Sequence, residues 1–288
     1  MRRLLLVNKP AGVVVYSTKG SGDGLMTIRA AITFAVSPSK PGTYCTLRRP
    51  QPVHRLDKPT SGVLIIAKTK PAMVNLSYQF RDRKIKKTYT AIVNGIPPEP
   101  FETKISSKEA YLLGVDVDPD TRSEDRWQVI DNELDEKSAV TVWTATKYSN
   151  SIDASENILT TVELKPKTGR FHQLRRHLSW VCKCPIVGDN EYDGGGSAMN
   201  LREEGLFLCS NKVTVEHPFY NGLKEDGRTI LDRLPEKDQE GLWVSPEGKV
   251  MVTATIELPD KFNSFVSKEN ARFAKSLSSV EESNILTK

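Results

Sequence analysis

The stretch Pro52-Val-His-Arg-Leu-Asp-Lys-Pro-Thr-Ser-Gly62 leads directly into the apolar run Val63–Ala67. Proline, aspartate, serine and glycine favour turns, and a short unbroken apolar run next to them is typical of a buried strand. The sequence therefore predicts a polar loop held by a rigid strand, a setting in which catalytic side chains tend to lie. Taken alone, Asp57 in this loop is either a functional carboxylate or a turn residue that pairs with Arg55.

Further strands are predicted from alternating or continuous apolar residues at Leu4–Val7, Val13–Tyr16, Lys87–Val93, Ala139–Tyr148, Leu159–Leu164, Leu206–Glu216 and Lys249–Leu258. Helices are predicted at Leu25–Val36, from Pro71 to about Arg83, at Phe171–Val181, and in the tail from Asp260. The remaining stretches, Ser17–Gly24, Pro38–Pro52 and Ile96–Asp135, are expected to be loops and connections, the last with short strands. Strands that mostly follow one another, with helices between them, predict an α+β fold with a mixed, mainly antiparallel sheet.

Composition narrows the class of protein. The chain has 288 residues, of which 38% are hydrophobic and 27% charged, and this balance excludes a membrane protein and a wholly disordered chain. Leu4–Val7 is too short for a signal-peptide core, and four cysteines do not make a disulfide scaffold in so long a chain. We therefore expect an intracellular, cytoplasmic protein with one domain over residues 1–288, of which 259–288 form a helical extension.

The net charge of +5 is compatible with a polyanionic partner but does not identify one. Basic residues concentrate in two stretches: Arg81, Arg83, Lys84, Lys86 and Lys87, and then Lys165, Lys167, Arg170, Arg175 and Arg176. Either stretch can be a solvated face. The second lies where a helix is expected to begin, near Thr168-Gly169-Arg170. Basic groups at that end oppose the helix dipole, and a phosphate or carboxylate there would relieve the conflict. The alternative is a surface helix whose arginines reach out to water.

Three segments stand out together: His54-Arg-Leu-Asp57 with Thr60-Ser-Gly62, Lys87-Thr-Tyr-Thr-Ala-Ile-Val-Asn-Gly95, and Lys165-Pro-Lys-Thr-Gly-Arg-Phe-His-Gln-Leu-Arg-Arg-His-Leu178. In this order and spacing they resemble the pseudouridine synthases of the RluA family, and are most similar to its tRNA pseudouridine synthase C branch. Asn8-Lys-Pro-Ala-Gly12, Pro185-Ile-Val-Gly-Asp189 and His217-Pro-Phe219 extend the resemblance over Val7 to Leu258. Cys209 and Phe171 depart from the family pattern, and both could alter RNA contacts.

The resemblance implies a sheet with flanking helices around a central RNA-binding cleft, and no separate RNA-binding module before Asn8. It implies that Asp57 is the catalytic carboxylate, that Tyr89 stacks near the flipped uracil and handles the C5 proton, and that Arg175 pairs with the aspartate. Leu174 and Arg55 are expected to line the pocket. Residues expected to contact RNA are Lys86, Lys87, Lys167, Arg170, His172 and Arg176. The chemistry breaks the N1–C1′ bond of uridine and joins C5 to C1′, and Asp57 could act as nucleophile or as base.

The implied reaction needs no metal, redox group or nucleotide cofactor. RNA is the expected partner, with tRNA favoured over ribosomal RNA, and the protein is expected to be a monomer. A zinc site at Cys182, Cys184, His172 and His177 is disfavoured because the spacing does not match the usual ligand pattern. A serine hydrolase is disfavoured because the sequence has no G-x-S-x-G turn. The remaining alternative is a catalytically silent RNA-binding protein of the same fold.

Overall fold

A computed structural model describes residues 3–17, 26–37, 39, 42–98, 104–115, 127–195, 201, 203–223 and 225–286. The chain divides into two units, of which the first contains Met1–Lys87 with Ser210–Ile256. The second contains Thr88–Cys209 with Glu257–Lys288. Asp57 thus belongs to the first unit, and Arg175 belongs to the second.

Strand β3 (Ser61–Thr69) of the first unit is buried along its whole length. Its apolar residues point to both faces of the sheet, which is why the sequence runs without polar alternation. It pairs antiparallel with β1 (Leu4–Lys9), in a register that sets Lys9 opposite Gly62. This pairing joins two of the sequence motifs, since the Asn8-Lys-Pro turn and the Thr60-Ser-Gly segment lie at the same end of the two strands.

The first unit also contains β2 (Thr46–Pro52), β9 (Leu208–Glu216), β10 (Leu242–Val244) and β11 (Val250–Thr255). Strand β3 neighbours both β2 and β9, β11 pairs with β9, and β10 pairs with β11. The approach of β9 depends on Gly62, which has φ +126°. A Cβ atom there would lie 2.3 Å from the backbone oxygen of Ser210. Only glycine fits at this position.

Helices of the first unit are α1 (Ile28–Ala35), α2 (Lys70–Arg81), α6 (Gly227–Asp232) and α7 (Glu236–Gln239). Local sequence explains α2 well. The Thr69 hydroxyl accepts from the Ala72 N–H at 3.3 Å, and Pro71 occupies the first turn. Leu76 is fully buried and belongs to the same hydrophobic core as Val63. Helix α2 therefore covers the first-unit sheet.

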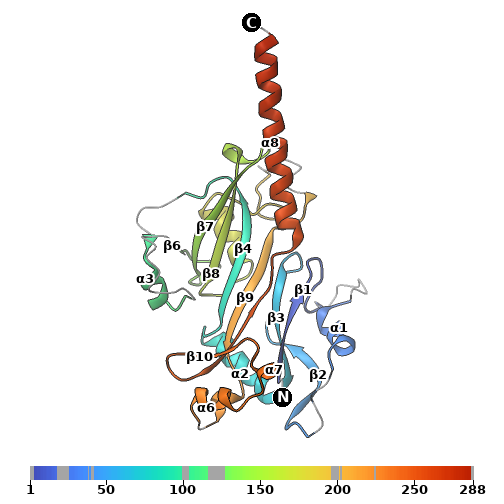
Figure 1. Cartoon of the computed structure of the whole chain (residues 1–288), viewed down its shortest axis with the longest axis vertical. Coiled ribbons are helices and arrows are strands. Elements are labelled where there is room, and N and C mark those ends of the chain that lie inside the picture. Colours follow the sequence, from blue (N-terminus) through green and yellow to red (C-terminus); the bar gives the residue numbers. More distant parts are fainter. Residues whose placement is uncertain are drawn as a thin grey trace. The chain divides into compact units, whose positions relative to one another are not determined.

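The strands of the second unit lie side by side in the order β4 (Lys86–Asn94), β8 (Ile158–Pro166), β7 (Val140–Asn150), β6 (Trp127–Asp131) and β5 (Lys104–Ile105) (Figure 1). The pairings of β4 with β8, β8 with β7, β7 with β6 and β6 with β5 are antiparallel. The register of the first pair sets Tyr89 opposite Leu164. The C-terminal end of β8 therefore lies beside the N-terminal end of β4. The motif that begins at Lys165 and the motif that begins at Lys87 meet there.

Helices of the second unit are α3 (Ser107–Leu112), α4 (Gln173–Arg176), which continues into a π-helical turn at His177–Val181, and α8 (Asp260–Leu286). Phe262 and Phe265 of α8 pack their rings against Phe207 at centroid distances of 5.2 and 4.6 Å. Farther along the helix, the Asn270 side-chain oxygen accepts from the Asn150 N–H at 2.8 Å. In the described residues, no helix combines the length and the apolar character that crossing a membrane requires.

The architecture confirms the predicted α+β fold with a mainly antiparallel sheet and flanking helices. The predicted strands that became β1, β3, β4, β7, β8, β9 and β11 are present, and so are the helices α1, α2 and α8, with ends shifted by a few residues. Residues 18–25, which hold most of the predicted glycine-rich loop and the start of the first predicted helix, lie outside the described residues. A single catalytic domain around an RNA-binding cleft stays a prediction.

Three local predictions were wrong. Val13–Tyr16 is not a strand, because the carbonyls of Val14 and Val15 accept from the first N–H groups of α1 instead of a sheet partner. The connection Pro38–Pro52 contains β2, whose prolines are tolerated in a strand with a shifted register. The region Ile96–Asp135 contains the short helix α3, which a capping box between Ser106 and Glu109 starts.

The predicted helix Phe171–Val181 also begins later than expected. The first residue of α4 is Gln173, and His172 before it has left-handed backbone with φ +49°. Thr168-Gly169-Arg170 is therefore a loop that precedes the helix, and Arg175 and Arg176 lie within the helical segment that continues to Val181. Both residues have carboxylate partners, Asp189 for Arg175 and Asp135 for Arg176, and these relieve the charge conflict expected from the sequence.

Candidate functional site

Asp57 lies in the loop between β2 and β3, as predicted, and it is half-buried. Its carbonyl accepts from the Thr60 N–H at 3.1 Å, which closes a turn immediately after the carboxylate. The next residue, Lys58, offers its carbonyl to the Gly12 N–H at 2.8 Å. The turn after Asn8 and the turn that carries Asp57 therefore pack together within the first unit.

The Lys9 side chain links the turn after Asn8 to the turn that carries Asp57 by hydrogen bonds. Its side chain is fully buried, and its ammonium donates to the carbonyls of Pro10 and Val13 at 2.8 Å each and to that of Lys58 at 3.3 Å. Burial lowers the pKa of Lys9 to about 8, while the negative charge of Asp57 acts in the opposite direction. The Lys9 ammonium therefore lies close enough to Asp57 for the two charges to attract each other. Lys9 was not among the residues predicted for the site.

His54 fixes the chain just before Asp57. Its Nε2 accepts from the Ile65 N–H at 2.9 Å, and its ring packs against Phe80 with 4.9 Å between the ring centroids. Burial lowers the pKa of His54 to about 3, and the positive charge of Lys87 acts in the same direction. A neutral imidazole is what the acceptor role requires. Arg55 follows with an exposed side chain, so the segment is anchored at His54 and open to solvent at Arg55.

The candidate site residues on β4 belong to different structural units of the chain. Lys86 and Lys87 are half-buried and belong to the first unit, while Tyr89 is half-buried and belongs to the second. Their side chains all retain some exposure, which is needed for contact with a ligand.

The Gln173 side chain fixes the conformation of the Thr168-Gly-Arg-Phe-His-Gln segment. Its buried side-chain oxygen accepts from the Thr168 hydroxyl at 2.7 Å and from the Arg170 N–H at 3.0 Å. Its amide nitrogen donates to the Val140 carbonyl and the Thr141 hydroxyl, both at 3.0 Å. One amide therefore ties the loop, the start of α4 and strand β7 together.

Arg175 is buried and has acidic partners in its own unit. Its guanidinium donates to both carboxylate oxygens of Asp189, at 2.7 and 2.6 Å, and to Glu191 at 3.0 Å. Asp189 is itself buried, so this is a desolvated two-pronged pair. The Pro185-Ile-Val-Gly-Asp189 motif therefore positions Arg175. Leu174 beside it is buried as well.

Arg176 and Lys165 are also buried against acidic partners. Arg176 donates to both carboxylate oxygens of Asp135 at 2.8 Å each, and its guanidinium lies over the Trp180 ring. Lys165 pairs with Glu163 at 3.0 Å. With Arg175, these make three residues of the second basic stretch that are not on a solvated face. This corrects the simpler interpretation of that stretch.

His172 connects the loop to exposed aromatic surface. Its ring stacks on Phe171 with 3.7 Å between centroids, and its Nδ1 lies 2.9 Å from the Tyr192 hydroxyl. Phe171 is exposed, Lys167 and Arg170 are half-buried, and the Arg170 Nε donates to a backbone carbonyl at 3.0 Å. These side chains surround the start of α4.

The predicted site residues therefore fall into two groups. The first unit contains Arg55, Asp57, Lys86 and Lys87, and the second contains Tyr89, Lys167, Arg170, His172, Leu174, Arg175 and Arg176. Pairing of Arg175 with Asp57 stays a prediction. Among the described residues, no group of three or more His, Cys, Asp or Glu is arranged to hold a metal ion. Burial raises the pKa of Cys182 to about 12, so this thiol is protonated at neutral pH.

Known proteins similar to this chain point to one family. The sequence profile of the RNA pseudouridylate synthase family matches residues 3–180. An uncharacterized RNA pseudouridine synthase of Synechocystis is 32% identical over 75% of this chain and 59% of its own length. A tRNA pseudouridine synthase C of Vibrio vulnificus is 32% identical over 74% of this chain and 81% of its own. Other relatives carry the names ribosomal large subunit pseudouridine synthases C and D.

The fold also has a counterpart among solved structures. Human RNA Pseudouridylate Synthase Domain Containing 4 superposes with a TM-score of 0.52 and 22% identity, over 90% of this chain and 87% of that one. The chain spans 59% and 63% of the lengths of the Synechocystis relative and of a Bacillus subtilis relative. The profile match over more than half of the sequence, with the motifs in order, shows that the chain belongs to the RNA pseudouridylate synthase family.

Proposed function

We propose that the protein isomerises uridine to pseudouridine in RNA, with Asp57 as the catalytic carboxylate. The observation that carries the proposal is the environment of Asp57: a family motif loop, half-buried, held by His54 and by the buried Lys9. A carboxylate whose loop is fixed by its neighbours is held in one place relative to a bound ligand. This is what a nucleophile or base acting on a nucleoside requires.

The reaction breaks two bonds and makes one between carbon atoms. The N1–C1′ bond of uridine breaks, the base turns, C5 bonds to C1′, and the proton on C5 leaves while N1 gains one. Asp57 acts on the sugar or on the base in this sequence. Tyr89 is proposed to stack on the uracil and to handle the C5 proton, its hydroxyl passing its own proton on as it takes the one from C5, because its half-buried ring and hydroxyl offer both a stacking face and a proton-transfer group.

Arg175 is proposed to stabilise the ionised Asp57 in the RNA complex. Its support is that a guanidinium has five donors, and that Asp189 and Glu191 orient it in the second unit. Leu174 and Arg55 are proposed to line the uridine pocket. Lys86, Lys87, Lys167 and Arg170 are proposed to lie along the RNA strand with His172, where cations bind phosphates without reading sequence. An RNA contact of Arg176 stays a prediction, because its guanidinium is buried against Asp135.

We propose tRNA as the substrate. Two relatives named tRNA pseudouridine synthase C match over 81% and 82% of their own lengths, whereas two named ribosomal large subunit synthases match over 60% and 58%. The catalytically silent alternative is disfavoured because Asp57, Tyr89 and Arg175 are all present. A cytoplasmic location and a monomeric state stay predictions.

The reaction itself provides the assay. RNA transcribed with tritium at C5 of uridine releases tritium when C5 loses its proton. Unmodified tRNA transcripts should release tritium and ribosomal RNA fragments should not. Release from ribosomal fragments alone would contradict the tRNA assignment, and binding of both RNAs without any release would favour the silent RNA-binding protein.

The residue assignment is tested with matched variants. Asp57→Asn should abolish tritium release while leaving RNA binding largely intact, because the amide keeps the shape and loses the charge. Asp82→Asn is the control, since this exposed carboxylate pairs with Arg81 on the surface of the same unit. Full release by Asp57→Asn would exclude Asp57 as the catalytic group.

A further inference from the structure

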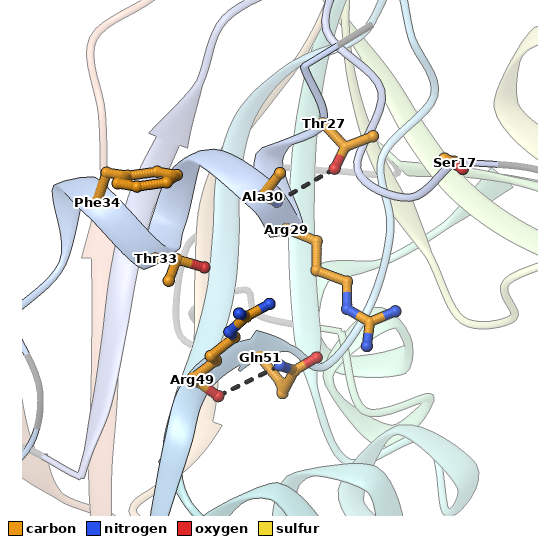
Figure 2. Close-up of a pocket in the computed structure, with 8 residues that line it drawn as sticks. All are labelled: Ser17, Thr27, Arg29, Ala30, Thr33, Phe34, Arg49 and Gln51. Carbon is orange, nitrogen blue, oxygen red and sulfur yellow. Dashed lines mark hydrogen bonds between the residues drawn. The ribbon is translucent and has the colours of Figure 1, made fainter. Parts of the chain in front are cut away.

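A cavity of about 340 Å³ lies between α1 and β2 in the first unit, apart from the Asp57 loop (Figure 2). Arg29 and Phe34 contribute to its wall from α1, and Arg49 and Gln51 contribute from β2. Figure 2 shows the Arg49 side chain reaching from β2 towards α1 and the Arg29 side chain extending from α1 towards β2. The volume is at the small end of the range for ligand pockets, which suits a group of about nucleotide size.

The charge of the cavity favours an anion. Of the described residues that line it, two are arginines and none is acidic. Both arginines are exposed, so their guanidinium groups can reach a ligand. Two guanidinium groups that face one cavity repel each other, and a phosphate between them would relieve this repulsion while accepting several hydrogen bonds.

The edge of the cavity also offers an aromatic ring. Phe34 is 88% exposed although it is one of the most hydrophobic side chains. An aromatic ring beside cationic side chains is the combination that binds single-stranded nucleic acid, because a base stacks on the ring while the phosphate binds the cations. Neither feature alone identifies a ligand, but together they match both parts of a nucleotide.

A short segment of the chain, from Gln51 to Asp57, connects the cavity to the candidate active site. Ser17 and Gln51 line it, and their neighbours Tyr16 and Pro52 are hydrogen-bonded, since the Tyr16 hydroxyl donates to the Pro52 carbonyl at 2.6 Å. From Pro52 to Asp57 the chain can span at most about 18 Å. Both ends of this segment are therefore within the reach of one short RNA segment.

Two arginines, one from the cavity and one from the loop that carries Asp57, act on Tyr16. Burial raises the pKa of Tyr16, while the positive charges of Arg29 and Arg55 act in the opposite direction. The two guanidinium groups therefore both lie near Tyr16. Arg29 lines the cavity, and Arg55 precedes Asp57 by two residues.

We propose that the cavity between α1 and β2 binds a nucleotide that flanks the target uridine, with its phosphate on Arg29 and Arg49 and its base stacked on Phe34. This inference rests on the proposed function, because it takes the RNA at Asp57 as given. It assigns the α1–β2 region a role in holding the substrate, separate from the chemistry.

Binding of an unmodified tRNA transcript tests the arginines. Arg29→Gln and Arg49→Gln should each weaken binding, and the slope of log K against log salt should become shallower by about 0.7 for each single-strand phosphate that is no longer neutralised. If both arginines bind one phosphate, the slope of the double variant should change by no more than this amount. Arg228→Gln is the control, because this exposed arginine lies on α6 and does not line the cavity.

Variants of Phe34 test whether a base stacks on its ring. Phe34→Ala should weaken binding roughly five- to 150-fold, the effect expected for one base–aromatic stack, whereas Phe34→Tyr should restore it. In tritium release, the cavity variants should raise KM more than they lower kcat, while Asp57→Asn should abolish kcat.

The two proposals fail differently. If the Arg29, Arg49 and Phe34 variants bind RNA with the affinity and salt slope of the Arg228→Gln control, the cavity does not bind the substrate, although Asp57 can still be catalytic. If Asp57→Asn retains turnover, the catalytic assignment of Asp57 fails, and if the wild type binds RNA but releases no tritium, the proposed function fails. If Phe34→Tyr binds as weakly as Phe34→Ala, base stacking on this ring is excluded.

Discussion

Acid should destabilise the protein through His54, in a pH window set by its environment. The folded-state pKa is about 3, against an ordinary value of 6.5. Below pH 6.5 the unfolded chain binds a proton at His54 and the folded chain does not, so the free energy of unfolding falls as the pH falls from 6.5 towards 3. The slope is about 1.36 kcal/mol per pH unit, which gives a decrease of about 2 kcal/mol at pH 5 from this residue alone.

The physical reason is the hydrogen bond to Ile65. Protonation of Nε2 would remove the acceptor for that N–H and would place a cation near the positive charge of Lys87. The folded state therefore resists protonation. Once protonation is forced, the segment that carries Asp57 should lose its anchor.

Urea unfolding of the wild type and of His54→Gln at pH 7, 6 and 5 measures the effect. His177 and His217, whose pKa values burial also lowers to about 4, remain in both proteins and cancel in the comparison. The stability difference between the two proteins should shrink by about 2 kcal/mol from pH 7 to pH 5. Parallel stability curves over this range would refute the assigned role of His54.

Three other perturbations act on glycine packing, a buried ion pair and phosphate binding. Gly62→Ala should cost about 3 kcal/mol or more, because its Cβ would meet the Ser210 backbone, whereas Gly222→Ala, which has open space around it, should be nearly neutral in the same denaturation assay. Asp189→Asn should cost about 3 kcal/mol and lower kcat, because it leaves the buried Arg175 without its main partner; an unchanged melting temperature would contradict this. RNA binding should weaken steeply with added salt, since phosphate contacts dominate, and a salt-independent affinity would count against the two basic stretches as the RNA path.

Elements with strong local signals were predictable from the sequence. Strand β3 is a continuous apolar run, α2 has a threonine cap followed by proline, and β7 and β8 alternate as strands do. Elements that depend on distant partners were not. Strand β2 carries prolines and was expected to be a connection. Helix α3 had a local signal, the capping box at Ser106 and Glu109, that could have predicted it.

The candidate site shows the same difference between residues with a local sequence signal and residues whose role depends on distant partners. Asp57 was singled out because its loop and strand are adjacent in the sequence. Lys9 and Asp189 carry no local signal of burial, since the Lys9 ammonium reaches a carbonyl 49 residues away and Asp189 binds an arginine 14 residues before it. Their roles depend on tertiary packing, which periodicity and turn chemistry do not encode. The motifs that contain them were recognisable, but the contacts they make were not.

Tritium release from C5-labelled tRNA by Asp57→Asn, alongside the wild type and Asp82→Asn, tests the central claim most directly. The account predicts release by the wild type and by the surface control, and none by Asp57→Asn at an RNA concentration where it remains bound. Release by Asp57→Asn at the rate of the control would contradict it, because the reaction would then proceed without the carboxylate on which the proposed chemistry depends.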